Sequence, residues 1–312
     1  MGSQPECQLP IVDFTHENMK PSSDHWLSAR QVVQNALEDH GCFLALYDKV
    51  GPQLYNSNFS VILDLFDLPA ETKKQKTSDK PQHGYSGQLS VVPLFESLTI
   101  DGPLTIQGCQ KFTRIMWPEG NDYFCETVHA YAKVVADLDR AVKRMVFESY
   151  GLDMQKYYSF LESTNYVLRS YKYRVPQMDE SNVGVYSHTD ATFTTILHQK
   201  EKGLEIKLKN GEWIELDASP SLFLVLAGDG FKAWSNDRIR ACEHRVTMNS
   251  KITRYSMGLL SYGAKIVEPE EGLVDEEHPM LYKPFDHYGY LRFFMTEAAL
   301  KSECRIKAYC GA

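Results

Sequence analysis

Val185-Tyr186-Ser187-His188-Thr189-Asp190 is the stretch on which the interpretation of this chain depends. In an extended strand, His188 and Asp190 leave the same face, because successive residues alternate between the two faces. With a second histidine from elsewhere in the fold, they would form the facial triad that binds iron(II) and leaves coordination positions open. The tripeptide His188-Thr189-Asp190 alone also fits a hydrogen-bonded His–Asp pair at the surface. The rest of the chain must decide between an iron site and such a pair.

The composition is that of a globular protein. Of 312 residues, 43% are hydrophobic and 24% charged. There are 33 Lys and Arg against 41 Asp and Glu, giving a net charge of -8, and no basic run marks a nucleic-acid partner. Apolar runs are far shorter than the roughly 20 residues that cross a bilayer, and no signal peptide is evident. The seven cysteines form no CxxC pair. We expect a cytoplasmic monomer without nucleic-acid or membrane partners.

Residues 1–160 are predicted to form an N-terminal helical region. Apolar residues recur at three- and four-residue steps in several segments, which is typical of amphipathic helices. The expected helices are 26–41, 54–66, 121–150 and 153–161, with short strands at 9–14 and 42–47. The basic run 71–76 is interpreted as a solvated helix face. Residues 77–117 are punctuated by proline and glycine and are interpreted as loop with brief extended pieces.

From Tyr166 the hydrophobic period becomes strand-like. The expected strands are 166–173, 183–188, 194–199, 204–208, 213–216, 222–227, 244–247 and 254–262. Many short strands between glycine-containing turns favour a sandwich or a jelly roll. We therefore predict an α+β fold, with a double-stranded β-helix (jelly-roll) core at 161–265. A C-terminal helical segment at 266–312, with its helix around 288–301, is expected to cover the site.

Two further groups fit an iron site inside such a barrel. His244 stands where a loop enters a strand, although a lone histidine is often a hydrogen-bonded core residue. Arg254 and Ser256 share one strand face, and a buried arginine is costly unless an anion meets it. The guanidinium matches a carboxylate with two parallel hydrogen bonds, and a serine hydroxyl adds another donor. An internal Arg–Glu salt bridge is the alternative.

Together, His188-X-Asp190, His244-Arg245-Val246 and Arg254-X-Ser256 resemble the plant iron(II)/2-oxoglutarate-dependent dioxygenases. The resemblance covers nearly the full length, because Leu9-Pro10-Ile11-Val12-Asp13-Phe14 and Gly41-Cys42-Phe43 look like the family's N-terminal signature. The segments His83-Gly84-Tyr85, Pro93-Leu94-Phe95-Glu96, Trp117-Pro118-Glu119-Gly120-Asn121 and Tyr282-Lys283-Pro284-Phe285 look like one of its branches. That branch includes glucosinolate-modifying (alkenyl- and hydroxyalkyl-forming) enzymes and alkaloid and lignan oxidases.

The resemblance implies that His188, Asp190 and His244 bind iron(II). It also implies that Arg254 and Ser256 hold the distal carboxylate of 2-oxoglutarate, with a further hydroxyl from Tyr173. The family strand that usually reads Asn-Tyr-Tyr aligns here with Tyr171-Lys172-Tyr173. Tyr171 therefore stands in place of the asparagine, and Lys172 in place of the first tyrosine.

Such a site would convert 2-oxoglutarate and O2 to succinate and CO2 while oxidising a C–H bond, with ascorbate as reductant. Hydroxylation is the default outcome; desaturation, ring closure and demethylation use the same oxidant. We expect a small, largely apolar specialised metabolite as substrate. The aromatics expected to line its pocket are Phe193, Phe293, Tyr290 and Phe95, with Leu94 beside the last.

Three other functions fit parts of the pattern. An ascorbate-dependent iron oxidase of the same fold would keep the triad and a similar Arg-X-Ser. A catalytically silent jelly roll would only bind a small molecule. A zinc hydrolase would use the same ligands for hydrolysis without consuming oxygen.

Overall fold

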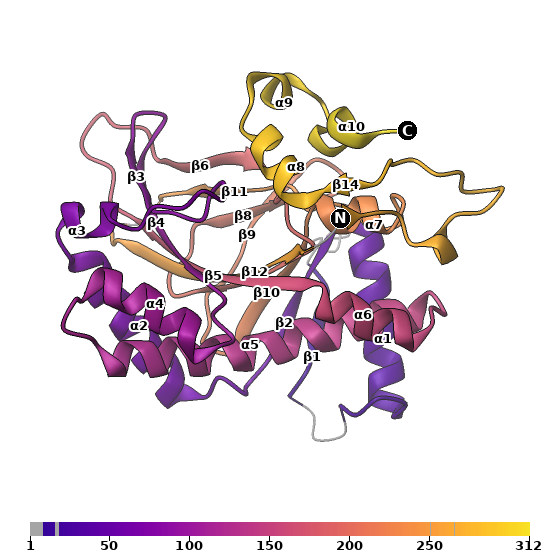
Figure 1. The fold of residues 1–312 in the computed structure, drawn as a ribbon, viewed down its shortest axis with the longest axis horizontal. Coiled ribbons are helices and arrows are strands. Elements are labelled where there is room, and N and C mark those ends of the chain that lie inside the picture. The colour runs from indigo at the N-terminus through magenta and orange to yellow at the C-terminus, as the bar shows by residue number, and fades with distance from the viewer. Residues whose placement is uncertain (1–8, 16–18, 250, 265) are drawn as a thin grey trace, which may run out of the picture.

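The computed structural model describes residues 9–15, 19–249, 251–264 and 266–312. Two sheets form its core (Figure 1). The larger sheet consists, in spatial order, of β1 (Ile11–Asp13), β2 (Cys42–Leu46), β10 (Leu222–Ala227), β7 (Thr194–Gln199), β12 (Arg254–Gly263), β5 (Thr164–Tyr173), β4 (Val92–Asp101) and β3 (Ser86–Leu89). The smaller sheet consists of β6 (Val183–His188), β11 (His244–Thr247), β8 (Leu204–Lys207) and β9 (Trp213–Glu215). The two sheets face each other as the predicted jelly roll.

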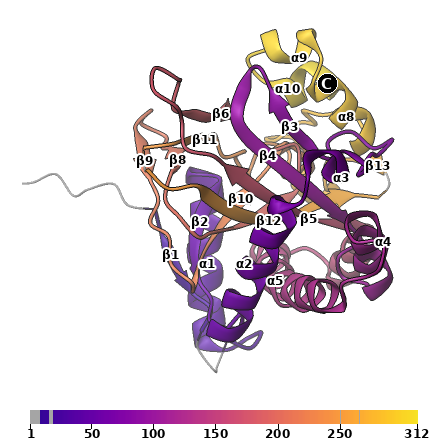
Figure 2. The same ribbon diagram turned by 90° about the vertical axis from the view of Figure 1, so that its left-hand side faces the viewer.

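Helices cover the outer face of the larger sheet (Figures 1 and 2). They are α1 (Asp24–Asp39), α2 (Pro52–Asp67), α4 (Ile106–Met116), α5 (Asp122–Ser149) and α6 (Met154–Glu162), with the short α3 (Ala70–Lys74) nearby. The main apolar core lies between these helices and the sheet, and a second apolar cluster lies between the two sheets. β10 is buried on both faces, which explains its continuous apolar sequence. None of the helices in the described ranges combines the length and apolar character of a membrane crossing.

The C-terminal segment lies on the other side, beside the end of β6 (Figure 1). It contains β13 (Ile266–Val267), the 3-10 turn Glu271–Leu273, β14 (Phe285–Asp286), α8 (His287–Phe294), α9 (Glu297–Lys301) and α10 (Arg305–Cys310). Asp286 caps α8 by accepting hydrogen bonds from the N–H groups of Tyr288 and Gly289. His287 then fixes the helix to the barrel: its Nε2 donates to the Ala191 carbonyl at 2.6 Å, and its Nδ1 accepts from the Gly263 N–H at 2.9 Å.

Several expectations are confirmed and others need correction. β6, β7, β10 and β11 have the predicted bounds, whereas the predicted loop 77–117 contains β3, β4 and α4. The turn at Gly228 begins the short helix α7 (Asp229–Trp234), α10 was not predicted, and the expected helix 288–301 is divided into α8 and α9. β1 to β4, which precede residue 160, belong to the larger sheet together with later strands.

The prediction that the basic run 71–76 forms a solvated helix face is wrong for two of its lysines, which are buried. Lys73 is 5% exposed and Lys76 is 7% exposed. The Lys73 ammonium contacts Glu96 at 2.6 Å, and that of Lys76 contacts Asp101 at 2.9 Å. Both carboxylates belong to β4, so the run ties α3 to the strand that the sequence did not reveal.

Candidate active site

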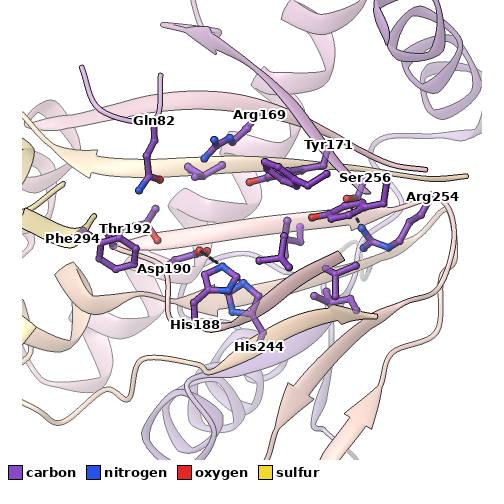
Figure 3. A pocket seen from close by; sticks show the side chains of 18 of the residues that line it. Gln82, Arg169, Tyr171, His188, Asp190, Thr192, His244, Arg254, Ser256 and Phe294 are labelled. Carbon is purple, nitrogen blue, oxygen red and sulfur yellow. Dashed lines mark hydrogen bonds and ion pairs between the residues drawn. The ribbon is translucent and has the colours of Figure 1, made fainter. Parts of the chain in front are cut away.

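The strand register brings the three predicted iron ligands together. His188 ends β6, His244 begins β11, and the two residues are paired across the antiparallel ladder. Asp190 follows two residues after His188, and its Oδ1 lies 3.7 Å from the His188 Nε2 and 3.8 Å from the His244 Nε2 (Figure 3). One possible ligand atom from each side chain lies within 4.8 Å of the others, the only such group of three in the described part of the chain.

Hydrogen bonds orient these side chains toward one another. Each imidazole Nδ1 contacts the backbone carbonyl two residues earlier, at 2.8 Å for His188 and 3.2 Å for His244. A carbonyl only accepts, so Nδ1 carries the proton and the Nε2 lone pair faces Asp190. The Asp190 Oδ2 accepts from the Thr195 hydroxyl at 2.6 Å, which leaves Oδ1 on the side of the histidines. Metal-binding histidines and carboxylates are usually held by hydrogen bonds of this kind.

Protonation also fits a metal centre. Burial, and then the neighbouring His244, lower the pKa of His188 to about 4. Burial works to raise the pKa of Asp190, but His244, His188 and the Thr195 hydroxyl outweigh it and leave that pKa lowered. A neutral imidazole and an ionised carboxylate are the forms that bind metal. Two nitrogens and one oxygen converging on one side match the ligand set that non-haem iron(II) takes.

A cavity extends from the triad between the two sheets (Figure 3). Its closed end holds Arg254, which is only 1% exposed. The guanidinium donates to the Ser256 hydroxyl at 2.9 Å and to the Gln199 side-chain carbonyl at 3.0 Å, and it lies 5.1 Å from the centre of the Tyr173 ring. No carboxylate of the described residues pairs with Arg254, and its Nε has no hydrogen-bond partner there. Glu201 is near enough to favour the charged form of Arg254, but it forms no direct ion pair with it. A buried guanidinium without a carboxylate in direct contact fits an anionic ligand.

Alternation along β5 decides which of its side chains enter the cavity. Arg169, Tyr171 and Tyr173 point inward, and all three line it. Burial raises the pKa of both tyrosines, so their hydroxyls stay protonated and can donate hydrogen bonds. Sequence reasoning found Tyr173 but missed Arg169 and the inward direction of Tyr171. For Tyr171, the two-residue spacing from Tyr173 was the signal available.

The expected substrate aromatics divide into one that lines the cavity and three that lie elsewhere. Phe95 is in the lining. Phe193 is a core residue, with its ring 4.8 Å from Phe160 and 5.2 Å from His287. It lies at the surface of a different pocket, because the backbone turns after Asp190 and directs the side chain away from the triad. Leu94, next to Phe95, is buried in the cluster between the sheets.

On α8, the side chain in the cavity is Phe294. Its neighbour Phe293 points away and packs on Tyr309, with ring centres 5.2 Å apart, because one helical residue rotates by about 100°. Tyr290 is fully buried, and its hydroxyl donates to the Asp229 carboxylate at 2.5 Å. The Asp229 N–H donates in turn to the Asp190 carbonyl at 2.7 Å. Tyr290 thus supports the backbone of the triad rather than the pocket wall.

A jelly roll with two histidines and one aspartate converging beside a buried arginine defines the class of mononuclear non-haem iron oxygenases that use a 2-oxo acid. Residues 163–261 match the 2OG-Fe(II) oxygenase superfamily, and residues 9–93 match the N-terminal region described for the non-haem dioxygenase in morphine synthesis. Two probable 2-oxoglutarate-dependent dioxygenases of Arabidopsis thaliana, AOP1.2 and AOP1, are each 41% identical to the chain, over 97% of it and 96% of their own length. The chain belongs to the 2OG-Fe(II) oxygenase superfamily.

Solved structures agree in fold. The dioxygenase for auxin oxidation of rice has a TM-score of 0.82 at 27% identity and covers 98% of this chain and 100% of its own. Its Arabidopsis thaliana counterpart, solved with 2-oxoglutarate, has a TM-score of 0.78 at 27% identity, with 87% and 100% covered. The chain is therefore an oxidoreductase whose cofactor and co-substrate are iron(II) and 2-oxoglutarate.

Proposed function

We propose that the chain oxidises a C–H bond of a small, largely apolar metabolite while 2-oxoglutarate is decarboxylated to succinate and CO2. His188, Asp190 and His244 hold the iron, and Arg254 and Ser256 hold the distal carboxylate of 2-oxoglutarate. The observation that carries the proposal is the presence, in one cavity, of the oriented triad and of a buried guanidinium that forms no direct ion pair with a carboxylate of the described residues.

The side chains divide the work by position. When bound, iron(II) would coordinate the 2-oxo acid and activate O2 for oxidation of the substrate. At the closed end, Arg254 and Ser256 anchor the co-substrate, and the protonated Tyr173 hydroxyl adds a donor near the guanidinium. The apolar walls, which include Phe95 and Phe294, exclude water and orient the substrate toward the triad. Hydroxylation is the default outcome of this arrangement. Ascorbate as reductant, a monomeric state and a cytoplasmic location stay predictions.

Anaerobic loading with iron(II), followed by O2 and measurement of succinate, tests the proposal. We expect Asp190→Ala to abolish both iron binding and 2-oxoglutarate-dependent succinate formation, because it removes the only carboxylate of the triad. Asp217→Ala is the matched control, since that carboxylate pairs with Lys202 at the surface. Iron-dependent oxidation with ascorbate but without 2-oxoglutarate would instead support the ascorbate-dependent oxidase. Metal-dependent hydrolysis without O2 uptake would support the zinc hydrolase. Full activity of Asp190→Ala would refute the triad.

A further inference from the structure

The cavity contains a second arginine that the co-substrate does not account for. Arg254 occupies the closed end, whereas Arg169 lies where the cavity opens into a wider cleft. Arg169 lines both spaces, together with His188, Phe95 and Phe294. Figure 3 shows the Arg169 side chain across the cavity from His188 and Asp190, beside Gln82. The two arginines therefore stand on different sides of the triad.

Arg169 has unused hydrogen-bonding capacity. Its Nε donates a long hydrogen bond to the Ser97 hydroxyl at 3.3 Å, and the guanidinium lies 5.7 Å from the centre of the Tyr171 ring. Across the described ranges, no other hydrogen bond and no ion pair of Arg169 is found. A guanidinium carries five N–H donors, so most of those on Arg169 have no acceptor from the protein.

Other arginines of the chain form ion pairs with carboxylates. The guanidinium of Arg174 contacts Glu180 at 2.5 Å, Arg144 contacts Glu148 at 2.8 Å, and Arg292 contacts Asp286 at 3.2 Å. Arg169 is close enough to help lower the pKa of Asp190, but no carboxylate of the described residues forms an ion pair with its guanidinium. An arginine that stays unpaired inside a cavity is placed to meet an anion that comes from outside the protein.

Arg169 is the charged residue of the cavity lining that neither iron(II) nor 2-oxoglutarate accounts for. The charged lining residues of the Asp, Glu, Lys and Arg types are Arg169, Arg254 and Asp190. Asp190 belongs to the triad, and Arg254 lies at the end assigned to the distal carboxylate of 2-oxoglutarate. One guanidinium matches one oxyanion group on a substrate by two parallel hydrogen bonds.

The surroundings of Arg169 indicate the rest of the ligand. Phe95, Val185 and Phe294 supply apolar surface at the junction of cavity and cleft, and Gln82 adds one polar amide. Phe294 is held in place by Arg305, whose guanidinium lies 4.3 Å from its ring centre. The outer cleft continues with exposed apolar side chains, among them Val91 and Met295. An apolar or aromatic body fits these walls.

We propose that Arg169 binds the single oxyanion group of the substrate, a carboxylate or sulfonate carried on an apolar or aromatic body. This inference rests on the proposed function and narrows its substrate class. Arg169 acts by two hydrogen bonds to the oxyanion, holding it across the cavity from His188 and Asp190. The C–H bond that reacts must then lie on the body of the molecule, within reach of the triad.

Equilibrium binding to the protein loaded with iron(II) and 2-oxoglutarate without O2 tests the inference. The probes are phenylacetate, 4-phenylbutyrate, indole-3-acetate and decanoate, each with its primary amide and its sulfonate analogue. We expect at least one oxyanion probe to bind wild-type protein about tenfold or more tightly than the matched amide, as for charge-assisted hydrogen bonds. Arg169→Met should remove this preference, and Arg169→Lys should retain part of it. Arg174→Met, which loses a surface ion pair, should keep the wild-type preference.

Each outcome decides the inference. Carboxylate or sulfonate binding that depends on Arg169 supports it and identifies the preferred oxyanion. Equal binding of acid and amide, no measurable binding of any oxyanion probe, or an unchanged preference in Arg169→Met would overturn it. The comparison of acid with amide on wild-type protein does not depend on how the variants fold. Because binding is measured without turnover, it is separate from succinate formation by the wild type, which tests the proposed function.

Discussion

At the scale of single residues, buried polar side chains differ in whether other protein groups satisfy all their hydrogen bonds. We expect those with unused donors to bind ligands. Asp139 is buried on α5 and accepts from the Lys143 ammonium at 2.6 Å and the Tyr166 hydroxyl at 2.7 Å, besides the Thr194 hydroxyl. That network is closed by protein groups alone and needs no ligand. Arg254, by contrast, is buried with its Nε lacking a hydrogen-bond partner among the described residues, and Arg169 has most of its donors unused.

His198 provides a residue-scale prediction about pH. Its Nε2 donates to the Pro220 carbonyl at 3.1 Å and its Nδ1 accepts from the Tyr131 hydroxyl at 3.0 Å, so the folded protein holds the neutral ring. Burial lowers its pKa from 6.5 to about 4. The unfolded chain therefore binds a proton first as the pH falls, and the stability present above pH 6.5 is lost toward pH 4. The expected loss from this residue is about 2 kcal/mol at pH 5.

Urea unfolding at pH 7.5 and pH 5 measures this effect. His198→Gln should lower stability at pH 7.5, and its deficit relative to wild type should shrink by about 2 kcal/mol at pH 5. Tyr131→Phe is the control, because it removes the hydrogen bond to Nδ1 but retains the histidine and hence most of the pH dependence. An equal deficit of His198→Gln at both pH values would contradict the assignment.

The sequence predicted those site residues whose spacing along a strand is informative. His188 with Asp190, and Arg254 with Ser256, are two-residue pairs at strand ends, and the structure brings both pairs to one cavity. Arg169 was missed because a single arginine in a strand has no distinctive spacing. Arg169 is distinguished only by the register of β5 against β12 and by the absence of an ion pair with a carboxylate in the described structure. Both are properties of the tertiary structure.

At the scale of elements, strands flanked by glycine turns were predictable and the hairpin of β3 and β4 was not. The β4 sequence Val92–Asp101 contains a proline and a glutamate, so alternation is weak, and its pairing with β5 supplies the order. That strand contributes Glu96 and Asp101, which hold the buried lysines of the preceding basic run. The basic run 71–76 was predicted to be solvated because the local sequence does not show that Glu96 and Asp101, the partners of its buried lysines, lie on a neighbouring strand.

The role of α8 leads to a prediction about Tyr290. Its hydroxyl donates to the buried Asp229 carboxylate, whose pKa burial raises to about 6. At pH 7.5 that carboxylate is ionised, so Tyr290→Phe should lower the unfolding free energy by about 2 kcal/mol, the usual contribution of a hydrogen bond to a charged group. At pH 5 Asp229 is largely protonated, and the loss should be smaller.

Denaturation of Tyr290→Phe at both pH values, combined with oxyanion-probe binding, distinguishes a supporting role from a substrate contact. We expect probe affinity to stay within about twofold of wild type, since Tyr290 lies outside the cavity lining. Phe294→Ala, which alters the lining from the same helix, is the comparison and should weaken binding of the apolar probes. A large loss of probe affinity in Tyr290→Phe, without a loss of stability, would restore Tyr290 to the substrate pocket.

At the scale of the whole molecule, the space between the two sheets contains both the cavity and an apolar cluster. Helices on the outer face of the larger sheet supply the main apolar core, which permits the inner faces to carry polar and charged groups. The C-terminal segment then joins the barrel end through His287 and Tyr290. The larger apolar cluster thus lies on the helical side of the larger sheet, and the cavity with the candidate iron ligands lies on the other.

The buried guanidinium of Arg254 predicts that binding of 2-oxoglutarate raises the stability of the whole fold. A buried guanidinium without a counter-ion is costly, and a bound dicarboxylate removes that cost. With manganese(II) replacing iron to prevent turnover, 2-oxoglutarate at about 100 times its Kd should stabilise the wild type by about 2.7 kcal/mol. Arg254→Met should lose this gain in stability. Without ligand, the variant should be at least as stable as the wild type, because it no longer buries this charge.

Arg245→Met is the control, because the Arg245 guanidinium pairs with Glu205 outside the cavity, and this variant should keep the ligand-dependent gain. Urea unfolding with and without 2-oxoglutarate measures both effects, and a gain that persists in Arg254→Met would show that another group holds the co-substrate.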